Sequence, residues 1–243
     1  MTALGVNTAG GLQAYRRDVT ADAAFGTDIK GGNRTVTLTE TNASQDGEAF
    51  VVIYKDSAVS SVNTVFVFDG FSASGGDGFG FNIAPIDGSS TAEMRLGIGF
   101  SFDGPDPLAP TGTGQVSQVG VNGVLGNLTN VAGHCDDARW GSTTQDASCS
   151  NGNLITVGGD NDPFSPLNPT VGQDHERYNL LPLLALGTTT VNVRTFNASN
   201  DDNIFLGVFQ FSGVATVVPV PEPATLALLA LGLTGLGFSR RKK

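Results

Sequence analysis

Cysteine and histidine are nearly absent from this chain of 243 residues, which contains only two of each. Two cysteines are too few for a cysteine-rich zinc module or for a miniprotein held together by several disulfides. Two histidines are too few for a zinc site with three histidine ligands. The sequence also holds a single tryptophan, Trp140, so it offers few of the aromatic platforms on which carbohydrate-binding proteins place sugars.

Charge is scarce and unevenly distributed along the chain. Charged residues make up 15% of the sequence, well below the roughly 25% of average soluble domains. The chain up to Val218 holds nine basic and 22 acidic residues, a formal net charge of −13. A body this acidic repels phosphate backbones, which argues against nucleic-acid binding. Hydrophobic residues make up 40% of the sequence, which is enough for a sizeable core.

The C-terminal tail has three parts that differ in composition. A linker at 218–223 contains Pro221, Glu222 and Pro223, and proline makes such a linker stiff and extended. The 15 residues 224–238 carry no charge. As a helix this run measures about 22 Å, against a hydrocarbon core of roughly 30 Å. Four basic residues end the chain: Arg240, Arg241, Lys242 and Lys243.

Together these parts predict a transmembrane or sorting helix at 224–239 and a basic cytoplasmic tail at 240–243. The long side chains of Arg240 and Arg241 can extend toward the membrane interface. This reduces the difference between the length of the helix and the thickness of the hydrocarbon core. Positive residues beside a span resist translocation, so we expect residues 1–217 to form an ectodomain on the far side of the inner membrane. The alternative is a buried C-terminal helix of a soluble fold.

The order of Pro-Glu-Pro motif, apolar segment and terminal basic cluster resembles the PEP-CTERM sorting signal of bacterial exported proteins. The resemblance covers about the last 25 residues. It implies recognition by an exosortase, a membrane-embedded transpeptidase, and processing near Pro221, Glu222 and Pro223. The family is associated with extracellular polysaccharide and biofilm matrix. The resemblance therefore implies a transient anchor in the inner membrane, followed by a location at the cell surface or outside the cell.

Proteins with this signal normally begin with a signal peptide, whereas this sequence opens without a basic n-region or an apolar h-region. Either the start is placed too far downstream, which we favour, or export is atypical. Export would place the chain in an oxidising compartment. We therefore expect Cys135 and Cys149 to form a disulfide. That bond would stabilise the fold by roughly 3 kcal/mol. A nucleophilic pair of His134 and Cys135 is the less favoured interpretation, because a bonded sulfur is not a nucleophile.

The body has the pattern of β-strands, with period-two alternation, β-branched and aromatic residues, and glycine-rich breaks. The continuous apolar run at 50–54 predicts a strand buried on both faces. Helical candidates are few and short, at 21–25 and 178–186. About nine strands over this length predict an all-β fold, an antiparallel and jelly-roll-like β-sandwich. The expected strands are 35–41, 50–54, 64–68, 78–83, 94–102, 115–125, 154–157, 188–196 and 204–211.

Acidic residues crowd the loops of the second half of the chain. Calcium takes six to eight oxygen ligands, several of them from closely spaced carboxylates on loops. The spacing here does not match the EF-hand pattern. The alternative is that these residues only form turns, through hydrogen bonds from their side chains to the backbone. The candidate calcium ligands are Asp160, Asp162, Asp174, Glu176, Asp201 and Asp202.

These features favour a structural or adhesive surface protein over an enzyme. The first alternative is a calcium-stabilised carbohydrate-binding module, which a groove carrying Trp140 or tyrosines beside the acidic loops would favour. The second is a secreted hydrolase, which needs two Asp or Glu carboxyls facing each other about 5–10 Å apart. Besides calcium no cofactor is expected. The predicted partners are an exosortase, the inner membrane and extracellular polysaccharide, with no nucleic acid.

Overall fold

The chain is built from antiparallel β-strands. The computed structural model describes residues 2–6, 13–22, 35–37, 39, 48–70, 73, 76–99, 117–132, 155–167, 173, 175–197 and 203–218. Within these ranges the helical structure is one 3₁₀ turn, η2 (Leu181–Leu183), and there is no α-helix. The predicted all-β, antiparallel class is therefore confirmed, whereas the jelly-roll-like sandwich stays a prediction. The predicted disulfide and the predicted C-terminal helix lie outside the described residues.

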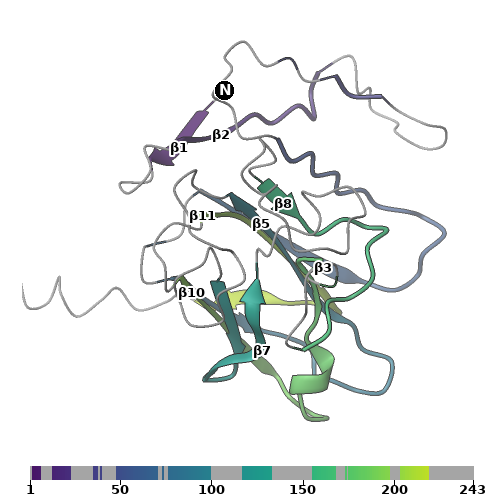
Figure 1. Ribbon diagram of the computed structural model, residues 1–243. Coiled ribbons are helices and arrows are strands. Elements are labelled where there is room, and N and C mark those ends of the chain that lie inside the picture. Colours follow the sequence, from purple (N-terminus) through teal and green to yellow (C-terminus); the bar gives the residue numbers. More distant parts are fainter. Residues whose placement is uncertain are drawn as a thin grey trace, which may run out of the picture.

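Figure 1 shows how the strands are arranged along the chain. They are β1 (Thr2–Val6), β2 (Gln13–Arg16), β3 (Asn63–Asp69), β4 (Gly78–Asn82), β5 (Ala92–Gly99), β6 (Ser117–Val121), β7 (Val124–Ala132), β8 (Ile155–Val157), β9 (Arg177–Asn179), β10 (Thr190–Asn197), β11 (Asn203–Ser212) and β12 (Thr216–Val218).

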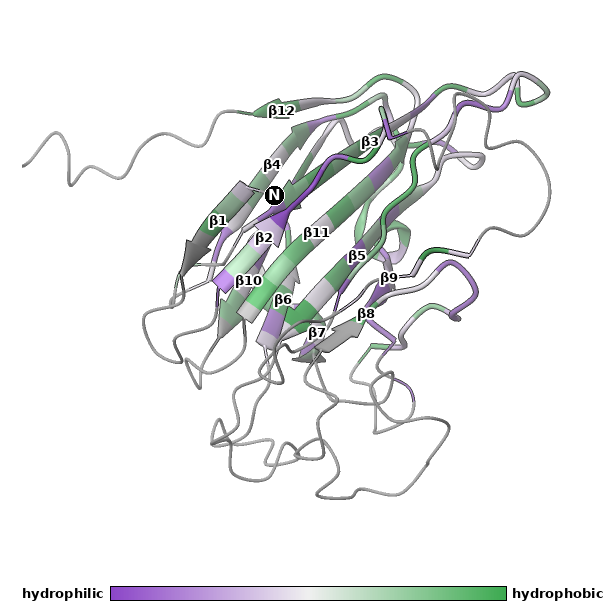
Figure 2. Ribbon diagram, turned by 90° about the horizontal axis from the view of Figure 1, so that it is seen from above, coloured by the Kyte–Doolittle hydropathy of each residue, from purple (hydrophilic) through white to green (hydrophobic). Residues whose placement is uncertain are grey.

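These strands form two five-stranded sheets and one hairpin. The first, which we call the β10 sheet, has the order β12-β4-β10-β6-β7. The second, the β5 sheet, has the order β3-β11-β5-β8, and β9 also pairs with β5. Figure 2 shows β3, β11 and β5 side by side, as their pairing requires. Strands β1 and β2 pair only with each other among the described residues.

A cluster of phenylalanine rings joins the two sheets. Alternate residues of a strand point to the same face, so each contributing strand presents two rings to the cluster. Phe81 and Phe209 are fully buried, and their ring centroids lie 4.7 Å apart. Such aromatic pairs contribute about 0.5–1.5 kcal/mol beyond the burial of their area. The rings come from β3 (Phe66, Phe68), β4 (Phe79, Phe81) and β11 (Phe209, Phe211).

The prediction of a buried strand at 50–54 is wrong. These residues form no strand, and their side chains are exposed, from 41% for Val51 to 72% for Tyr54. In the predicted strand at 35–41, the described residues 35–37 and 39 are not in a strand either. The predicted helix at 178–186 is also wrong, because the segment holds the end of β9 and then η2, where Pro182 stands at the start of the turn.

The predicted strand at 115–125 is two strands joined by a tight turn. Asn122 and Gly123 connect β6 to β7, with φ values of +53° and +99°. Two successive residues at positive φ are what a two-residue type I′ hairpin turn requires, and Asn-Gly is the sequence most suited to it. The side-chain oxygen of Asn127 accepts a hydrogen bond of 2.7 Å from the Val121 N–H, which fixes the register beside the turn.

Within the described ranges, no helix is long and apolar enough to cross a bilayer. The predicted span at 224–239 lies outside the described residues.

Candidate functional site

One of the predicted acidic loops connects β8 to β9 and contains Asp160 and Asp162, and we call it the acidic loop. It interrupts one edge of the β5 sheet. Strands β8 and β9 both pair with β5, β8 along Gly97–Gly99 and β9 along Glu93–Arg95. Between them Leu96 bonds to both ends of the loop. Its N–H donates to the carbonyl of Glu176 at 2.9 Å, and its carbonyl accepts from the N–H of Gly158 at 3.0 Å. The chain therefore leaves the sheet edge after Gly158 and returns to it at Glu176.

The two residues at this junction have restricted conformations. A Cβ on Gly158 would lie 2.4 Å from the carbonyl oxygen of Glu176, so only glycine fits this close approach. Glu176 has a φ of +47° and a fully buried side chain. A residue other than glycine is rarely found in this left-handed region. The loop is thus held in place at its base by backbone contacts.

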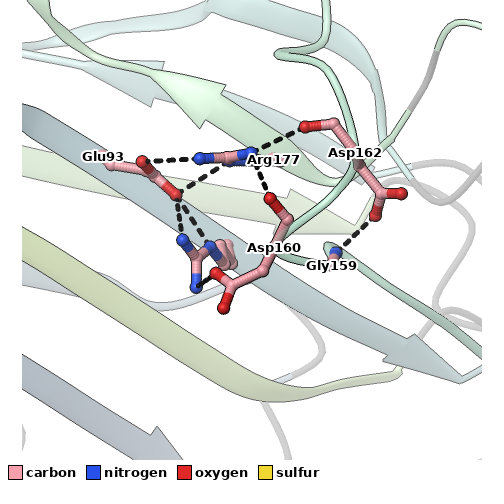
Figure 3. A network of polar contacts seen from close by, with 6 residues as sticks. Glu93, Gly159, Asp160, Asp162 and Arg177 are labelled. Atoms are coloured by element: carbon pink, nitrogen blue, oxygen red, sulfur yellow. Dashed lines mark hydrogen bonds and ion pairs between the residues drawn. The ribbon is translucent and has the colours of Figure 1, made fainter. Parts of the chain in front are cut away.

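A network of charged side chains covers the face of β5 and β9 beside this loop (Figure 3). Arg95 and Arg177 are direct partners across the two strands. Like charges in that position destabilise a strand pair. The carboxylate of Glu93 lies between them. It accepts from Arg95 Nε at 2.7 Å and from Arg177 Nε at 2.9 Å, so one acid serves both guanidinium groups.

Arg177 also holds the acidic loop through its backbone. Its Nη1 donates to the carbonyls of Asp160 at 2.9 Å and Asp162 at 2.7 Å. Its guanidinium carbon lies 4.7 Å from the centre of the Phe164 ring, within the range of a cation–π contact. The arginine therefore occupies the position at which a cation would meet the carbonyl oxygens of this loop.

The two acidic side chains of the loop have separate partners. The carboxylate of Asp160 pairs with Arg95 at 2.8 Å, although its side chain is 81% exposed. The carboxylate of Asp162 accepts a hydrogen bond from the Gly159 N–H, three residues earlier, which is turn chemistry of the kind that needs no metal. Within the described ranges, no three His, Cys, Asp or Glu residues form a group suited to a metal ion.

The other predicted site residues are divided between the core and the part of the chain that is not described. Glu176 is buried at the base of the loop. Tyr178 is fully buried in the core, so it offers no platform to a sugar, whereas Tyr15 and Tyr54 are exposed. The calcium set stays a prediction. Outside the described residues lie Asp174, Asp201, Asp202, Cys135, Cys149, Trp140, Pro221, Glu222, Pro223, Arg240, Arg241, Lys242 and Lys243.

Asp77, which precedes β4, is a carboxyl group whose environment raises its pKa. Burial raises the pKa above the ordinary value of 3.8, and a hydrogen bond from the Ala73 N–H opposes this effect. A raised pKa is one requirement of a general acid. The backbone of Asp77 is tied to β10, because its N–H donates to the hydroxyl of Thr195 at 3.0 Å and its carbonyl accepts from the Thr195 N–H at 2.9 Å.

The β10 sheet has an outward face that differs from the rest of the acidic body. Its five strands contain a single charged residue, Arg194, which lies on the central strand. Arg194 is exposed and stands directly between Gly78 of β4 and Gly120 of β6. Val193 and Thr195 on either side of it point inward and are buried. The same face carries Asn82, Gln118, Thr190, Asn192, Phe196 and Thr216.

Comparison with known proteins identifies the tail. Residues 219–242 match the family model of the PEP-CTERM protein-sorting motif. The chain carries this sorting signal. Its predicted presence is therefore confirmed, and it implies export, transient anchoring in the membrane and processing by an exosortase. Neither a curated protein nor a solved structure matches this chain.

Proposed function

We propose that this protein is a structural or adhesive component of the bacterial cell surface or extracellular matrix, and that its β-body has no catalytic role. The observation that carries the proposal is the sorting motif at residues 219–242. In this proposal the tail holds the chain in the inner membrane until an exosortase processes it near Pro221, Glu222 and Pro223. The body, residues 1–217, then remains outside the cytosol.

The bonding of the acidic loop supports a non-catalytic role. A general acid or nucleophile needs a carboxyl that is available to a substrate. Glu93 is instead held by two arginines, and Asp160 is paired with Arg95. Asp162 accepts a hydrogen bond from the backbone of its own turn. Asp160, and Glu93 through Arg177, hold the loop against the sheet, whereas Asp162 fixes the turn within it.

The experiment that tests the proposal is mass spectrometry of the protein recovered from the surface of its native cell. We expect a C-terminus near Pro221–Glu222–Pro223, with the apolar segment and the basic cluster removed. Changing Glu222 to alanine should leave the tail uncut. Changing Pro219 to alanine removes a proline outside the triplet and serves as the matched control. An uncut wild-type chain in the cytosol would overturn the proposal.

The same sample tests the predicted disulfide. Digestion without reduction should yield a peptide in which Cys135 is joined to Cys149. Recovery of both cysteines as free thiols from the exported protein would overturn the pairing.

A further inference from the structure

We infer that Arg194 binds the carboxylate of Glu222, and that this contact shelters the sorting motif on the outward face of the β10 sheet before the exosortase cuts the tail. The inference rests on the proposed function, because it concerns the regulation of the processing described there. It assigns to the exposed arginine an occupant from the same chain, the segment that directly follows β12.

The first observation is that Arg194 lacks the partner that the other described arginines have. The arginines at positions 16, 17, 95 and 177 each pair with a carboxylate at 2.5 to 2.9 Å. Arg194 is exposed and forms no ion pair with any residue that the structure describes. The five strands of its sheet contain no Asp or Glu. The carboxylate of Asp77, beside β4, accepts a hydrogen bond from the Ala73 N–H. The guanidinium fork of Arg194 is thus suited to a carboxylate from beyond these residues.

The second observation is that β12 brings the sorting motif close to Arg194. Strands β12 and β10 flank β4, and the register pairs both Val218 and Asn192 with Gly80. Arg194 lies two residues beyond Asn192, in the direction in which β12 runs out of the sheet. Two strand spacings and two residues along the strand put the Cα atoms of Val218 and Arg194 about 12 Å apart. The four residues from Val218 to Glu222 span at most about 14 Å, so Glu222 can reach Arg194.

The third observation is that the surface between the end of β12 and Arg194 is open. A Cβ on Gly80 would lie 3.2 Å from the amide oxygen of Asn192 and 3.3 Å from the Cβ of Val218. These two side chains therefore lie over Gly80, on the face that Arg194 shares because it is two residues from Asn192. A Cβ on Gly78, the direct partner of Arg194, would meet no atom within 4 Å. The tail can therefore cross β4 at Gly78 without displacing a described side chain.

The composition of the tail favours this path. Pro219 and Pro221 have no N–H to donate, which weakens any continuation of β12 along β4. Proline also keeps the segment extended, so little of its reach is lost. A carboxylate tethered within reach has a high effective concentration at Arg194, whereas a free acidic molecule is repelled by the acidic body. The tether therefore explains how one exposed arginine can select this carboxylate.

A motif held on the body is less accessible to a membrane-embedded enzyme. Glu222 cannot lie in the active site of the exosortase and against Arg194 at the same time. The contact therefore lowers the fraction of chains that are ready for processing. One exposed ion pair contributes only a small free energy, so the contact should slow the cut by about two- to fivefold and not prevent it.

Cross-linking of the uncut full chain, purified in a mild detergent, tests the contact. A water-soluble carbodiimide activates a carboxylate, a neighbouring lysine amine displaces the activated group to form an amide, and the reagent leaves as a urea. In Arg194→Lys the introduced amine should be joined to Glu222, which mass spectrometry of the digested chain identifies. Adding Glu222→Gln should remove this cross-link. Arg17→Lys is the matched control, because Arg17 lies 2.6 Å from Asp22 and the introduced amine should be joined to that residue.

The rate of tail removal in the native cell tests the shelter. Pulse labelling should show that Arg194→Gln is cut about two- to fivefold faster than the wild-type chain. Arg17→Gln removes another exposed charge and should leave the rate unchanged. Thermal unfolding of each variant verifies that the body is folded.

Two results would overturn the inference. One is the absence of a cross-link to Glu222 in Arg194→Lys under conditions in which Arg17→Lys is joined to Asp22. The other is an equal rate of tail removal in Arg194→Gln and the wild-type chain. Neither would overturn the proposed sorting, which is judged by whether the tail is cut. Conversely, a chain left uncut in the cytosol would overturn the proposed function, and cross-linking of the purified chain would still decide whether the contact exists.

Discussion

Changing Glu93 to glutamine removes the one carboxylate that lies between two guanidinium groups. Glutamine has nearly the same shape, so the substitution changes charge and leaves packing almost intact. Arg95 and Arg177, which are direct partners across β5 and β9, would then face each other as like charges. Among the acidic residues that the structure describes, Arg95 would keep its contact with Asp160 alone, whose side chain is 81% exposed. We therefore expect a loss of stability and no change of fold.

The burial of the three side chains sets the size of the effect. Their exposed fractions are 13% for Glu93, 22% for Arg95 and 20% for Arg177. Exposed ion pairs contribute up to about 1 kcal/mol, whereas removal of one partner of a fully buried pair costs about 3–5 kcal/mol. The network lies between these limits, so Glu93→Gln should lower the free energy of unfolding by about 2 kcal/mol. For a protein of this size the melting temperature should fall by about 4–8 °C.

Urea-induced unfolding of the full chain measures this free energy. The matched control is Asp69→Asn, which breaks the pair with the 59% exposed Arg16 and should cost less than about 1 kcal/mol. The double variant Glu93→Gln/Arg177→Gln should be less destabilised than the sum of the two single variants, because removing both charges also removes the repulsion that Glu93→Gln alone creates. If Glu93→Gln costs no more than Asp69→Asn, the role given to this carboxylate is refuted.

Three further predictions concern a turn, a carboxyl group and calcium. Gly76→Ala should cost about 3 kcal/mol in urea, because φ is +85° and a Cβ would lie 1.8 Å from the carbonyl oxygen of Thr195. Gly123 also has a positive φ, +99°, but a Cβ there would meet no atom within 4 Å, so Gly123→Ala should cost only about 1–2 kcal/mol. If the two substitutions lower the free energy of unfolding equally, the clash with Thr195 does not set the cost at Gly76. Burial raises the pKa of the Asp77 carboxyl in the folded state above 3.8. Between pH 3.8 and that raised pKa the folded state binds more protons than the unfolded state, so the free energy of unfolding falls as the pH rises. Asp77→Asn should remove this pH dependence, and an unchanged pH dependence would contradict the argument. Millimolar calcium should raise the melting temperature if the six predicted ligands bind it, whereas no shift would remove the site.

Residue type and spacing predicted the class of the fold because they determine whether a short segment forms a strand, whatever segment it pairs with. Alternating apolar residues predicted the strands that became β4, β5, β10 and β11, since each strand places every second residue in the core. The turn at Asn122 and Gly123 also had a local signal, and applying it would have divided the predicted strand at 115–125 correctly.

Other features depend on contacts between distant parts of the chain, which local patterns cannot reveal. An apolar run such as residues 50–54 shows that burial would be favourable, but it does not show which segment would pair with it. The bond between Glu93 and Arg177 joins residues 84 positions apart and depends on the register of β9 against β5. The acidic loop was therefore found from its composition, whereas the arginine that holds it was missed.

The position of β12 determines how mechanical force reaches the folded body. This strand is the last described element, and the sorting motif begins at the next residue, 219. Its pairs run from Thr216 with Asn82 to Val218 with Gly80. Pro221 is three residues beyond Val218, so the chain between them spans at most about 11 Å. While the tail is anchored, any pull on the membrane or on the body is transmitted through these three residue pairs. The short strand β12 is thus the element that would peel away first under tension.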